Sequence, residues 1–360
     1  MKFIRYSNVK FVKGFSRGAI YDLQNSEFRV VPNELVDFSD SIIGKTRTEI
    51  FKLYDLVNNQ NIVEYLDFLE DKYGSFVSDE IYDCFSEISD EWDFPGIITN
   101  AHVENYLLKK KEIYLLDSIG VKSILFEFDK NPFYKSIELE EYLSHFSQTS
   151  IDEITINLLN YDNSAKKMQK IIKSCPKLQI NYFNCRSRPE VQLENINFYE
   201  HEFEKLINKV IPPTIELYFE SRSHHIYFNR KIYIGSKGQI RNSAESRDLN
   251  YSISSVSKDE LKDLVNNHDF RENFDIKKDN CDICNICEYR YCCLDKRIPI
   301  KRSDNTFYFL SECDYNPLIN KWKTEKDYLS PYKTGAKSSS KGFLIDERKV
   351  KMVNHKIWSQ

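Results

Sequence analysis

The feature that most constrains this chain is a run of cysteines toward its C-terminal end. Five of the nine cysteines lie within 280–293, and a sixth, Cys313, follows in Cys313-Asp314-Tyr315-Asn316-Pro317. Thiols at this density usually bind a metal or form disulfides. The compartment in which the chain works decides between the two.

The composition points to a globular protein of the cytoplasm. The 360 residues suffice for two or three domains, and 41% hydrophobic with 29% charged residues argues against disorder. The formal net charge of −4 gives no general attraction to nucleic acid or to an anionic membrane. Residues 1–8 lack the apolar run of a secretory signal, and no segment is apolar enough to span a membrane. We therefore expect a cytoplasmic protein that binds neither nucleic acid nor a membrane. Its clustered cysteines are then expected to be metal ligands.

Residues 1–92 predict a small α+β module. Alternating apolar and polar residues predict short strands at 3–6, 19–23 and 28–31. A helical pattern opens at Pro32, and the further helices are expected at 48–57 and 62–72. Such a module is either a structural extension or a peptide-docking unit whose strand edge accepts an extended leader segment.

Residues 93–222 follow a linker-like 92–96 and alternate strands with helices. The strands are expected at 97–103, 123–128, 153–159, 178–183 and 214–219. The helices between them are expected at 111–119, 136–146, 164–174 and 202–210. Five strands interleaved with helices predict an α/β fold with a parallel sheet, built as a partial βα barrel or an open wound sheet.

The chain changes character after residue 222. A strand at 226–234, a glycine-containing turn and a second short strand at 239–242 precede a helix at 258–266, which leads into the cysteines. We take 223–330 as one metal-binding domain. Residues 331–360 are rich in lysine and serine and predict a basic, flexible tail.

Four of the clustered cysteines have the spacing of a single metal site. Cys284 and Cys287 form a Cys-x2-Cys pair whose sulfurs can share one centre, Cys293 lies six positions further, and Cys313 comes from a separate segment. Four thiolates suit a tetrahedral Zn²⁺ or an iron–sulfur cluster, and the spacing fits both.

The remaining cysteines and the histidine pair are weaker candidates for metal ligands. A ferredoxin-like run starting at Cys281 would need a cysteine where Tyr291 stands, so Cys281 and Cys292 are spare candidates. The isolated cysteines are expected to fill the core as small apolar residues: Cys84, Cys175 and Cys185. The pair at 224–225 is expected in an exposed loop without a metal role.

Two sequence motifs that would indicate a cofactor or nucleotide site are absent from the chain. No Cys-x3-Cys-x2-Cys occurs in the chain, and 100–118, after the first expected sheet strand, contains no cysteine. No glycine-rich phosphate loop occurs either, in a chain with only ten glycines. No catalytic residue is assigned from the sequence.

Several stretches together resemble one known family. The specific one is Cys287-Glu288-Tyr289-Arg290-Tyr291 with its cysteine spacing, which resembles a SPASM domain, the auxiliary-cluster module of radical S-adenosylmethionine peptide maturases. The weaker ones are 12–14, 22–24, 32–35, 98–101, 229–231 and 313–317. With these, the whole chain is similar to the SPASM-domain maturase of grasp-with-spasm systems, which work with an ATP-grasp ligase on a ribosomal precursor peptide.

The departures from the family pattern are informative. Tyr227, Ser243 and Lys296 stand where that pattern has the cysteines of a first auxiliary cluster. The second cluster's positions are all cysteines here: Cys284, Cys287, Cys293 and Cys313. The resemblance thus implies one [4Fe–4S] cluster at these four residues, with zinc as the alternative. Without Cys-x3-Cys-x2-Cys, radical chemistry by this chain alone is not expected.

The resemblance implies a three-part chain with a leader-peptide-recognition-like module, a partial barrel resembling a radical S-adenosylmethionine core, and a SPASM-like metal domain. It implies a maturation protein that binds the leader of a precursor peptide and acts with an ATP-grasp ligase. Two alternatives stay open. One is a stand-alone peptide-modifying enzyme that uses the strand ends of the barrel, and the other is a zinc-stabilised interaction protein.

Overall fold

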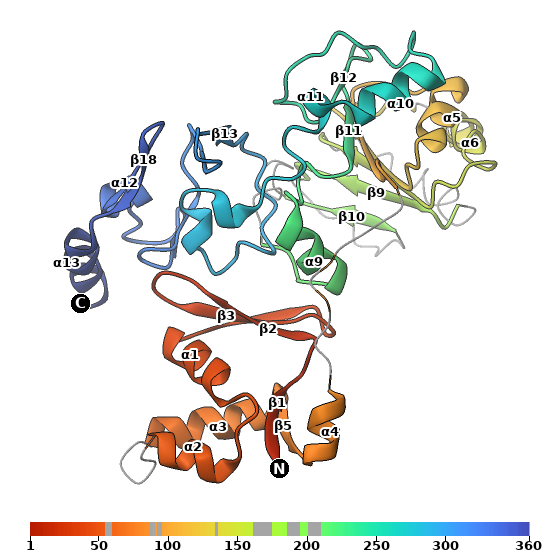
Figure 1. The fold of residues 1–360 in the computed structure, drawn as a ribbon. Coiled ribbons are helices and arrows are strands. Elements are labelled where there is room, and N and C mark those ends of the chain that lie inside the picture. Colours follow the sequence, from red (N-terminus) through yellow and green to blue (C-terminus); the bar gives the residue numbers. More distant parts are fainter. Residues whose placement is uncertain are drawn as a thin grey trace.

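The structure is a computed structural model that describes residues 1–54, 60–85, 89, 91, 96–133, 136–160, 175–185, 195–200 and 210–359. Three expected segments lie wholly or mostly outside these residues. They are the helix at 164–174, the helix at 202–210 and the linker at 92–96. The described residues form an N-terminal module, a mainly parallel sheet with its helices, and a cysteine-rich region that includes the C-terminus (Figure 1).

The N-terminal module contains a three-stranded antiparallel sheet, β2-β3-β4, and a two-stranded sheet of β1 and β5. Side chains alternate across β3, so that Ile20 packs with α1 and α3 while Ala19 and Tyr21 pack on the cysteine-rich region. The strand is therefore buried on both faces. The elements are β1 (Lys2–Arg5), β2 (Val9–Lys13), β3 (Gly18–Asp22), β4 (Glu27–Val31), α1 (Asn33–Ile42), α2 (Arg47–Tyr54), α3 (Gln60–Lys72), β5 (Gly74–Val77) and α4 (Asp79–Cys84).

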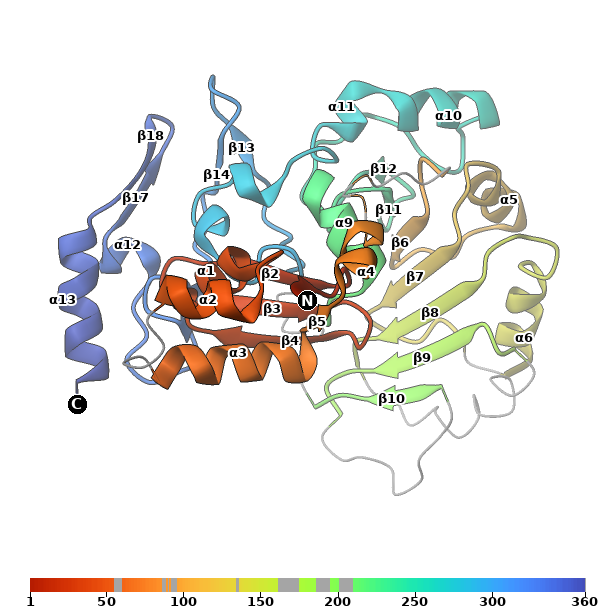
Figure 2. The ribbon, with the colours of Figure 1, turned by 60° about the horizontal axis from the view of Figure 1, so that its bottom comes forward.

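A seven-stranded sheet forms the middle of the chain, in the order β10-β9-β8-β7-β6-β11-β12 (Figure 2). Only the short β12 runs antiparallel to its neighbour. The predicted α/β architecture with a parallel sheet is confirmed. The elements are β6 (Asn100–Glu104), α5 (Lys110–Ser118), β7 (Ser123–Phe128), α6 (Ser136–Ser144), β8 (Glu153–Leu158), β9 (Leu178–Tyr182), β10 (Ile196–Phe198), α9 (Ile215–Ser223), β11 (Lys231–Ile234), β12 (Ile240–Arg241), α10 (Lys258–Asn266) and α11 (His268–Arg271).

The two faces of this sheet differ in chemistry. On one face, side chains such as Val103, Phe126 and Ile156 are buried in a core shared with α5, α6 and α10. The other face carries polar side chains at the alternate positions, among them Glu127 and Asn157. Period-two alternation with one apolar face is what a sheet covered by helices on that side requires.

Two expectations about the sheet are wrong. The segment 214–219 is not a strand but the start of helix α9, because the side chain of Thr214 accepts the backbone N–H of Leu217 at 3.2 Å and caps a helix after Pro212 and Pro213. The strand expected at 226–234 shrinks to β11, because Arg230 has a positive φ of 52°. β11 then pairs in parallel with β6 and extends the large sheet.

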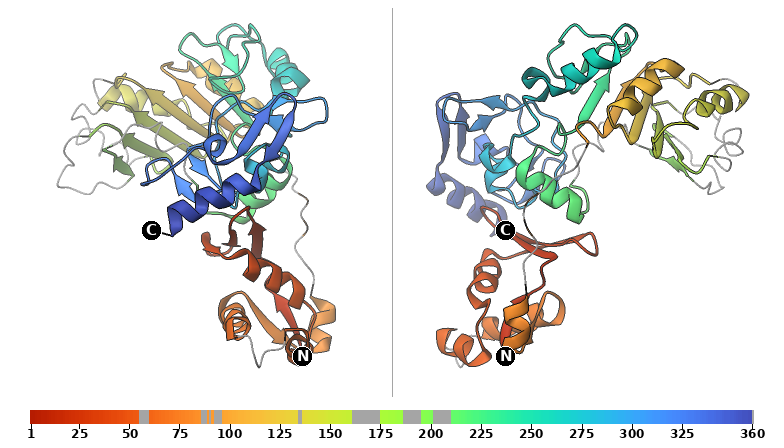
Figure 3. Two further views of the ribbon diagram at one scale, coloured as in Figure 1. Left: turned by 90° about the vertical axis from the view of Figure 1, so that its left-hand side faces the viewer. Right: turned by 45° about the vertical axis from the view of Figure 1, so that its right-hand side comes forward.

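The cysteine-rich region consists of short elements joined by turns. They are η1 (Lys278–Asn280), η2 (Cys284–Ile286), β13 (Ile300–Lys301), β14 (Phe307–Tyr308), β15 (Tyr315–Asn316), β16 (Lys321–Trp322), α12 (Pro331–Thr334), β17 (Ala336–Ser339), β18 (Gly342–Ile345) and α13 (Glu347–Trp358). In three views the region lies over the β2–β3 hairpin of the N-terminal module (Figures 1–3).

The expectation of a flexible tail at 331–360 is wrong for the residues described. The tail forms α12, the β17–β18 hairpin and the 12-residue helix α13. Val350 of α13 is only 2% exposed and packs with Ala336, Leu318 and Ile283. Lysine and serine content suggested disorder, but the buried Val350 of α13 and Ala336 of β17 anchor the segment to the cysteine-rich region.

Candidate metal centre

The four predicted ligand residues come together in space. Cys284, Cys287, Cys293 and Cys313 all line one cavity of about 210 Å³. Cys313 reaches it from the strand pair β15–β16, whereas the other three come from the loop around η2. The cavity volume is several times that of one water molecule.

The two spare cysteines do not line this cavity, although Cys281 packs in the same apolar cluster as Cys284. Cys281 is fully buried in a small apolar cluster with Phe307 and Phe309, and its thiol points to the carbonyl of Lys277 at 3.5 Å. Cys292 is also fully buried, and its thiol lies 3.3 Å from the hydroxyl of Tyr21. Burial raises the pKa of both thiols to about 12. Both behave as core residues.

A strained turn presents the first cysteine of the set. Ile283, immediately before Cys284, has a φ of +66°, which is unusual for a β-branched side chain. Its side chain is only 6% exposed and is held by Leu318 and by the tail residues Ala336 and Val350. Packing of the tail therefore fixes the backbone that aims Cys284 into the cavity.

Two of the four sulfurs accept hydrogen bonds from the backbone. The N–H of Tyr289 lies 3.4 Å from the sulfur of Cys287, and the N–H of Tyr315 lies 3.4 Å from the sulfur of Cys313. The same Cys-x-Tyr turn thus occurs twice. N–H donors of this kind stabilise thiolate over thiol and tune metal–sulfur centres.

Burial disfavours charge on the isolated thiols. Burial raises the pKa of Cys313 to about 11 and the pKa values of Cys284 and Cys287 well above their ordinary value. A bound metal would deprotonate such thiols outright, and the protein would then need positive charge nearby.

That positive charge is present at the cavity. Arg297 lies with its Nη2 at 3.9 Å from the sulfur of Cys284 and forms a buried ion pair of 2.6 Å with Asp295. Lys278 is 2% exposed and donates to the carbonyl of Cys293. Burial opposes both positive charges, but neighbouring negative groups, Asp295 among them, keep the pKa values of Lys278 and Arg297 above their ordinary values.

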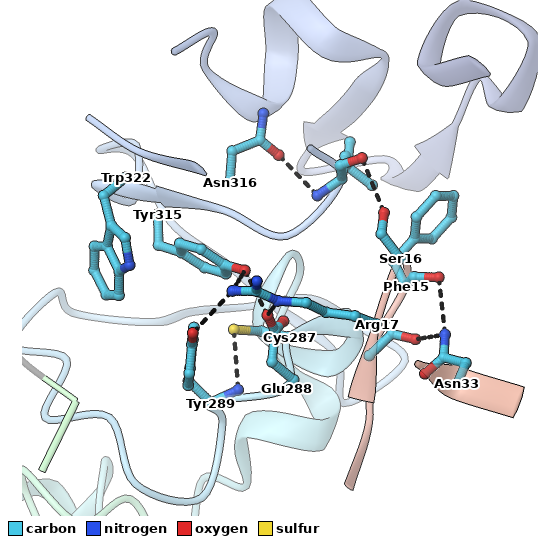
Figure 4. A network of polar contacts seen from close by, with 12 residues as sticks. Phe15, Ser16, Arg17, Asn33, Cys287, Glu288, Tyr289, Tyr315, Asn316 and Trp322 are labelled. Carbon is cyan, nitrogen blue, oxygen red and sulfur yellow. Dashed lines mark hydrogen bonds and ion pairs between the residues drawn. The ribbon is translucent and has the colours of Figure 1, made fainter. Parts of the chain in front are cut away.

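The tip of the β2–β3 hairpin docks onto this region (Figure 4). The N–H of Phe15 donates to the carbonyl of Ile286 at 2.8 Å, and the hydroxyl of Ser16 donates to the carbonyl of Leu318 at 3.0 Å. Gly14 is needed here, because a Cβ on it would lie 2.4 Å from the carbonyl oxygen of Arg17.

Arg17 extends from this tip into the tyrosine cluster beside the cysteines (Figure 4). Its Nε lies 2.7 Å from Oε1 of the fully buried Glu288, and its Nη2 donates to the hydroxyls of Tyr289 and Tyr315 at 2.9 and 3.2 Å. These are the two tyrosines whose backbone N–H groups reach the sulfurs. Spacing and composition did not indicate Arg17, and only the two glycines around it marked a tight turn.

The described side chains do not close around a single ion. Among the residues with described positions, no three His, Cys, Asp or Glu side chains are grouped tightly enough to hold one metal ion. A tetrahedral zinc with Zn–S bonds of about 2.3 Å would bring its sulfurs to roughly 4 Å from one another. The four cysteines line a cavity of about 210 Å³.

The three positions where the family pattern has further cysteines do not form one site here. Tyr227 lies under the amino group of Lys231, with 3.2 Å between the ring centre and Nζ. Ser243 is fully buried and its hydroxyl lies 2.9 Å from that of Ser246. Lys296 lines the four-cysteine cavity instead.

The structure agrees with only some of the expectations for the isolated cysteines and for the histidine pair at 224–225. Cys185 is buried as predicted, and Cys175 is half-buried against the same core, but Cys84 is exposed on α4 because its helix has no buried face among the described residues. His224 pairs with Asp275 at 2.9 Å, while His225 is fully buried rather than exposed.

Comparison with known proteins gives limited similarity. No protein-family model matches the sequence, and no curated protein matches it. No described helix has the length and apolar character needed to cross a membrane. Structural comparison aligns the chain with solved structures of SuiB from Streptococcus suis.

Three SuiB crystal structures illustrate this similarity. SuiB bound to S-adenosylmethionine has 12% identity and a TM-score of 0.32, SuiB itself 12% and 0.30, and SuiB bound to precursor peptide SuiA 11% and 0.34. Each match covers 81% of this chain and 94% of SuiB. TM-scores of this size do not establish a shared fold.

Proposed function

We propose that this chain is a maturation protein for a ribosomally synthesised peptide, with one metal centre held by Cys284, Cys287, Cys293 and Cys313. The observation that carries the proposal is that these four cysteines, selected by their spacing and by the family resemblance, line one cavity. Cys281 and Cys292, which the same reasoning set aside, do not line it. A SPASM-like domain with one cluster gives such an arrangement.

The proposed metal group is a [4Fe–4S] cluster, with zinc as the alternative. A cavity of about 210 Å³ lined by the four cysteines leaves room for a group larger than one ion, which supports the cluster. The N–H donors of Tyr289 and Tyr315 and the cations Lys278 and Arg297 suit either group, since both leave a net negative charge with four thiolates. When bound, a cluster supplies electron transfer or structural support.

The test of this centre is metal analysis of the anaerobically purified chain. Iron and sulfide in equal amounts, about four of each per chain, with broad visible absorbance support the cluster. Zinc alone, without sulfide or visible absorbance, would overturn it in favour of the structural alternative. Cys287→Ser should lose the metal, and the matched variant Cys281→Ser should keep it.

The proposed docking site for the leader peptide is the free edge of β4. Among the described strands, β4 pairs only with β3, and its first four residues are exposed. Its inward side faces α3, where the Arg29 guanidinium lies 5.6 Å from the ring centre of Phe68. An unpaired strand edge beside a helix accepts an extended peptide by strand addition.

Peptide binding tests the docking module. The probe is the leader segment of a short peptide encoded beside this gene, labelled and titrated by fluorescence anisotropy. Val30→Asp and Arg29→Glu should weaken binding at least tenfold. The control is Leu344→Asp, an exposed apolar position on the strand β18 of the tail. Equal affinity of all variants would exclude β4 as the docking edge.

We propose further that the chain acts with an ATP-grasp ligase, as the resemblance implies. No Cys-x3-Cys-x2-Cys occurs to bind the cluster that cleaves S-adenosylmethionine, which supports an accessory or presenting role. The precursor's mass should then change only when the ligase, ATP and this chain are combined. A change with the ligase alone, at the same rate, would contradict the role.

A stand-alone peptide-modifying enzyme is the second candidate, and the polar face of the sheet favours it. Glu104 and Glu127 are in register on neighbouring strands, and the row continues with Asn157 and Asn181, joined by a 2.8 Å amide hydrogen bond. The row lies near the carboxyl ends of the strands, where α/β sheets place their sites. Precursor modification by this chain alone, lost in Glu104→Gln, would select this candidate.

A further inference from the structure

A second cavity lies between the parallel sheet and the cysteine-rich region. It measures about 390 Å³, within the range of small-molecule sites. The cavity has both polar and apolar lining. The polar residues are Asn100, His102, Ser123, Tyr227, Asn229 and Lys231. None of the four proposed metal ligands lines it, although Leu294 lines both this cavity and that of the metal centre.

Lys231 is the chemically distinctive residue of this cavity. It opens β11, in register with Asn100 of β6, and its Nζ lies 3.2 Å from the ring centre of Tyr227 and 5.8 Å from that of Phe228. Among the described residues, no carboxylate lies within ion-pair distance of it; Glu245 acts only from further away. The amine thus lies against the ring of Tyr227 and lines the cavity, with no carboxylate of the described residues at ion-pair distance.

These surroundings favour the neutral amine. Burial lowers the pKa of Lys231 to about 7, and the distant charge of Glu245 opposes this only in part. A lysine at the surface, with a pKa of about 10.4, is almost fully protonated at pH 7. Neutral lysines in apolar pockets are the ones that react as nucleophiles.

An imidazole lines the same cavity. Nε2 of His102 is buried, has no hydrogen-bond partner among the described residues, and lies 3.4 Å from Oε2 of Glu127. An anionic ligand would meet a lysine whose charge is disfavoured, with the carboxylate of Glu127 behind His102. An uncharged carbonyl compound would meet a neutral amine, which is the better chemical match.

We propose that Lys231 binds a small aldehyde or ketone in this cavity as an imine. The lone pair of Nζ attacks the carbonyl carbon and forms the C–N bond, and the oxygen takes up a proton. Loss of water then leaves the C=N bond, and the two protons of the amine depart in that water. No oxidant or reductant is involved, and the proposal does not depend on the metal centre or on peptide binding.

The test traps the imine with benzaldehyde and cyanoborohydride at pH 7 on the full chain, with peptide mapping by mass spectrometry. Lys231 should be modified about 100-fold faster than the exposed Lys237 of the turn between β11 and β12, because its neutral fraction is far larger. Its rate should rise with a midpoint near pH 7 and should saturate with benzaldehyde concentration.

Three outcomes would overturn the proposal. They are equal rates at Lys231 and Lys237, a fast site that persists in Lys231→Arg, and a rate that never saturates, which would mean a reactive amine without a binding site. Lys237→Arg is the matched control and should keep the fast phase. The comparison of two lysines within the wild-type chain stays decisive even if Lys231→Arg folds poorly.

Discussion

Arg17 Nε lies 2.7 Å from Oε1 of Glu288, across 271 positions of sequence. The Glu288 side chain is fully buried and that of Arg17 is 27% exposed, so the ion pair joins the hairpin of the N-terminal module to the interior of the cysteine-rich region. Because Arg17 also holds the hydroxyls of Tyr289 and Tyr315, it connects the proposed peptide module to the two Cys-x-Tyr turns.

Arg17→Ala should therefore lower the free energy of unfolding by about 3 kcal/mol, because it leaves a buried carboxylate without its cation. Urea unfolding followed by circular dichroism measures this. The control is Lys13→Ala on the same hairpin, whose ion pair with Asp37 is exposed at both ends and should contribute under about 1 kcal/mol.

The double variant Arg17→Met/Glu288→Gln separates charge from packing. It removes both charges, so it should recover a large part of the loss caused by Arg17→Ala. If the double variant is no more stable than Arg17→Ala, the hairpin tip stabilises the interface by shape alone and the ion-pair explanation is wrong.

Val350→Asp tests the anchored tail. A charge at this buried position of α13 should lower the free energy of unfolding by about 2–4 kcal/mol. It should also open 331–359 to limited proteolysis and weaken metal retention, since Val350 packs on Ile283 before Cys284. The matched control is Met352→Asp, 70% exposed on the same helix, which should change stability by under about 0.5 kcal/mol. Equal protease sensitivity of the two variants would contradict the anchoring.

Periodic, one-sided segments could be predicted from the sequence. A strand was expected at 123–128 and a helix at 258–266, and β7 and α10 occupy these ranges because in each a single buried face sets the spacing of apolar residues. Helix α9 could not be predicted in this way. Its residues alternate like a strand, and the cap at Thr214 outweighs that pattern.

The candidate site was predictable only in its thiols. Local spacing and resemblance indicate Cys284 and its three partners, because those residues follow a pattern along the chain. Lys278, Arg297 and Arg17 act through tertiary contacts, one of them across 271 positions, and no local pattern marks such contacts. The same holds for Lys231, whose lowered pKa comes from burial that the sequence does not state.

Thiol reactivity should separate the cysteines in the metal-free chain. Burial raises the pKa of Cys281 and Cys292 to about 12, so at pH 8 only about one molecule in 10⁴ carries either thiolate. Iodoacetamide should alkylate the exposed Cys84 at least ~100-fold faster than these two until urea unfolds the chain. Mass spectrometry of the digested chain measures this. Fast labelling of Cys292 in the folded chain would contradict its contact with Tyr21.

The buried imidazole of His225 should make stability depend on pH. Its side chain is fully buried, neither ring nitrogen has a hydrogen-bond partner among the described residues, and burial lowers its pKa to about 3. In the unfolded chain a histidine titrates near pH 6.5. Between these values the unfolded chain binds a proton that the folded chain does not, so the free energy of unfolding falls as the pH falls from about 6.5 to about 3.

His225→Phe removes the group that binds a proton in the unfolded chain. The new ring should keep the packing against Phe228, whose ring centre lies 4.7 Å from that of the imidazole. Between pH 7 and pH 4 the variant should lose about 3 kcal/mol less than the wild-type chain in urea unfolding. The control is His268→Phe, an exposed site that should leave the pH dependence unchanged. If wild type and His225→Phe lose stability in parallel, the imidazole takes up a proton in the folded state and is not sealed from water.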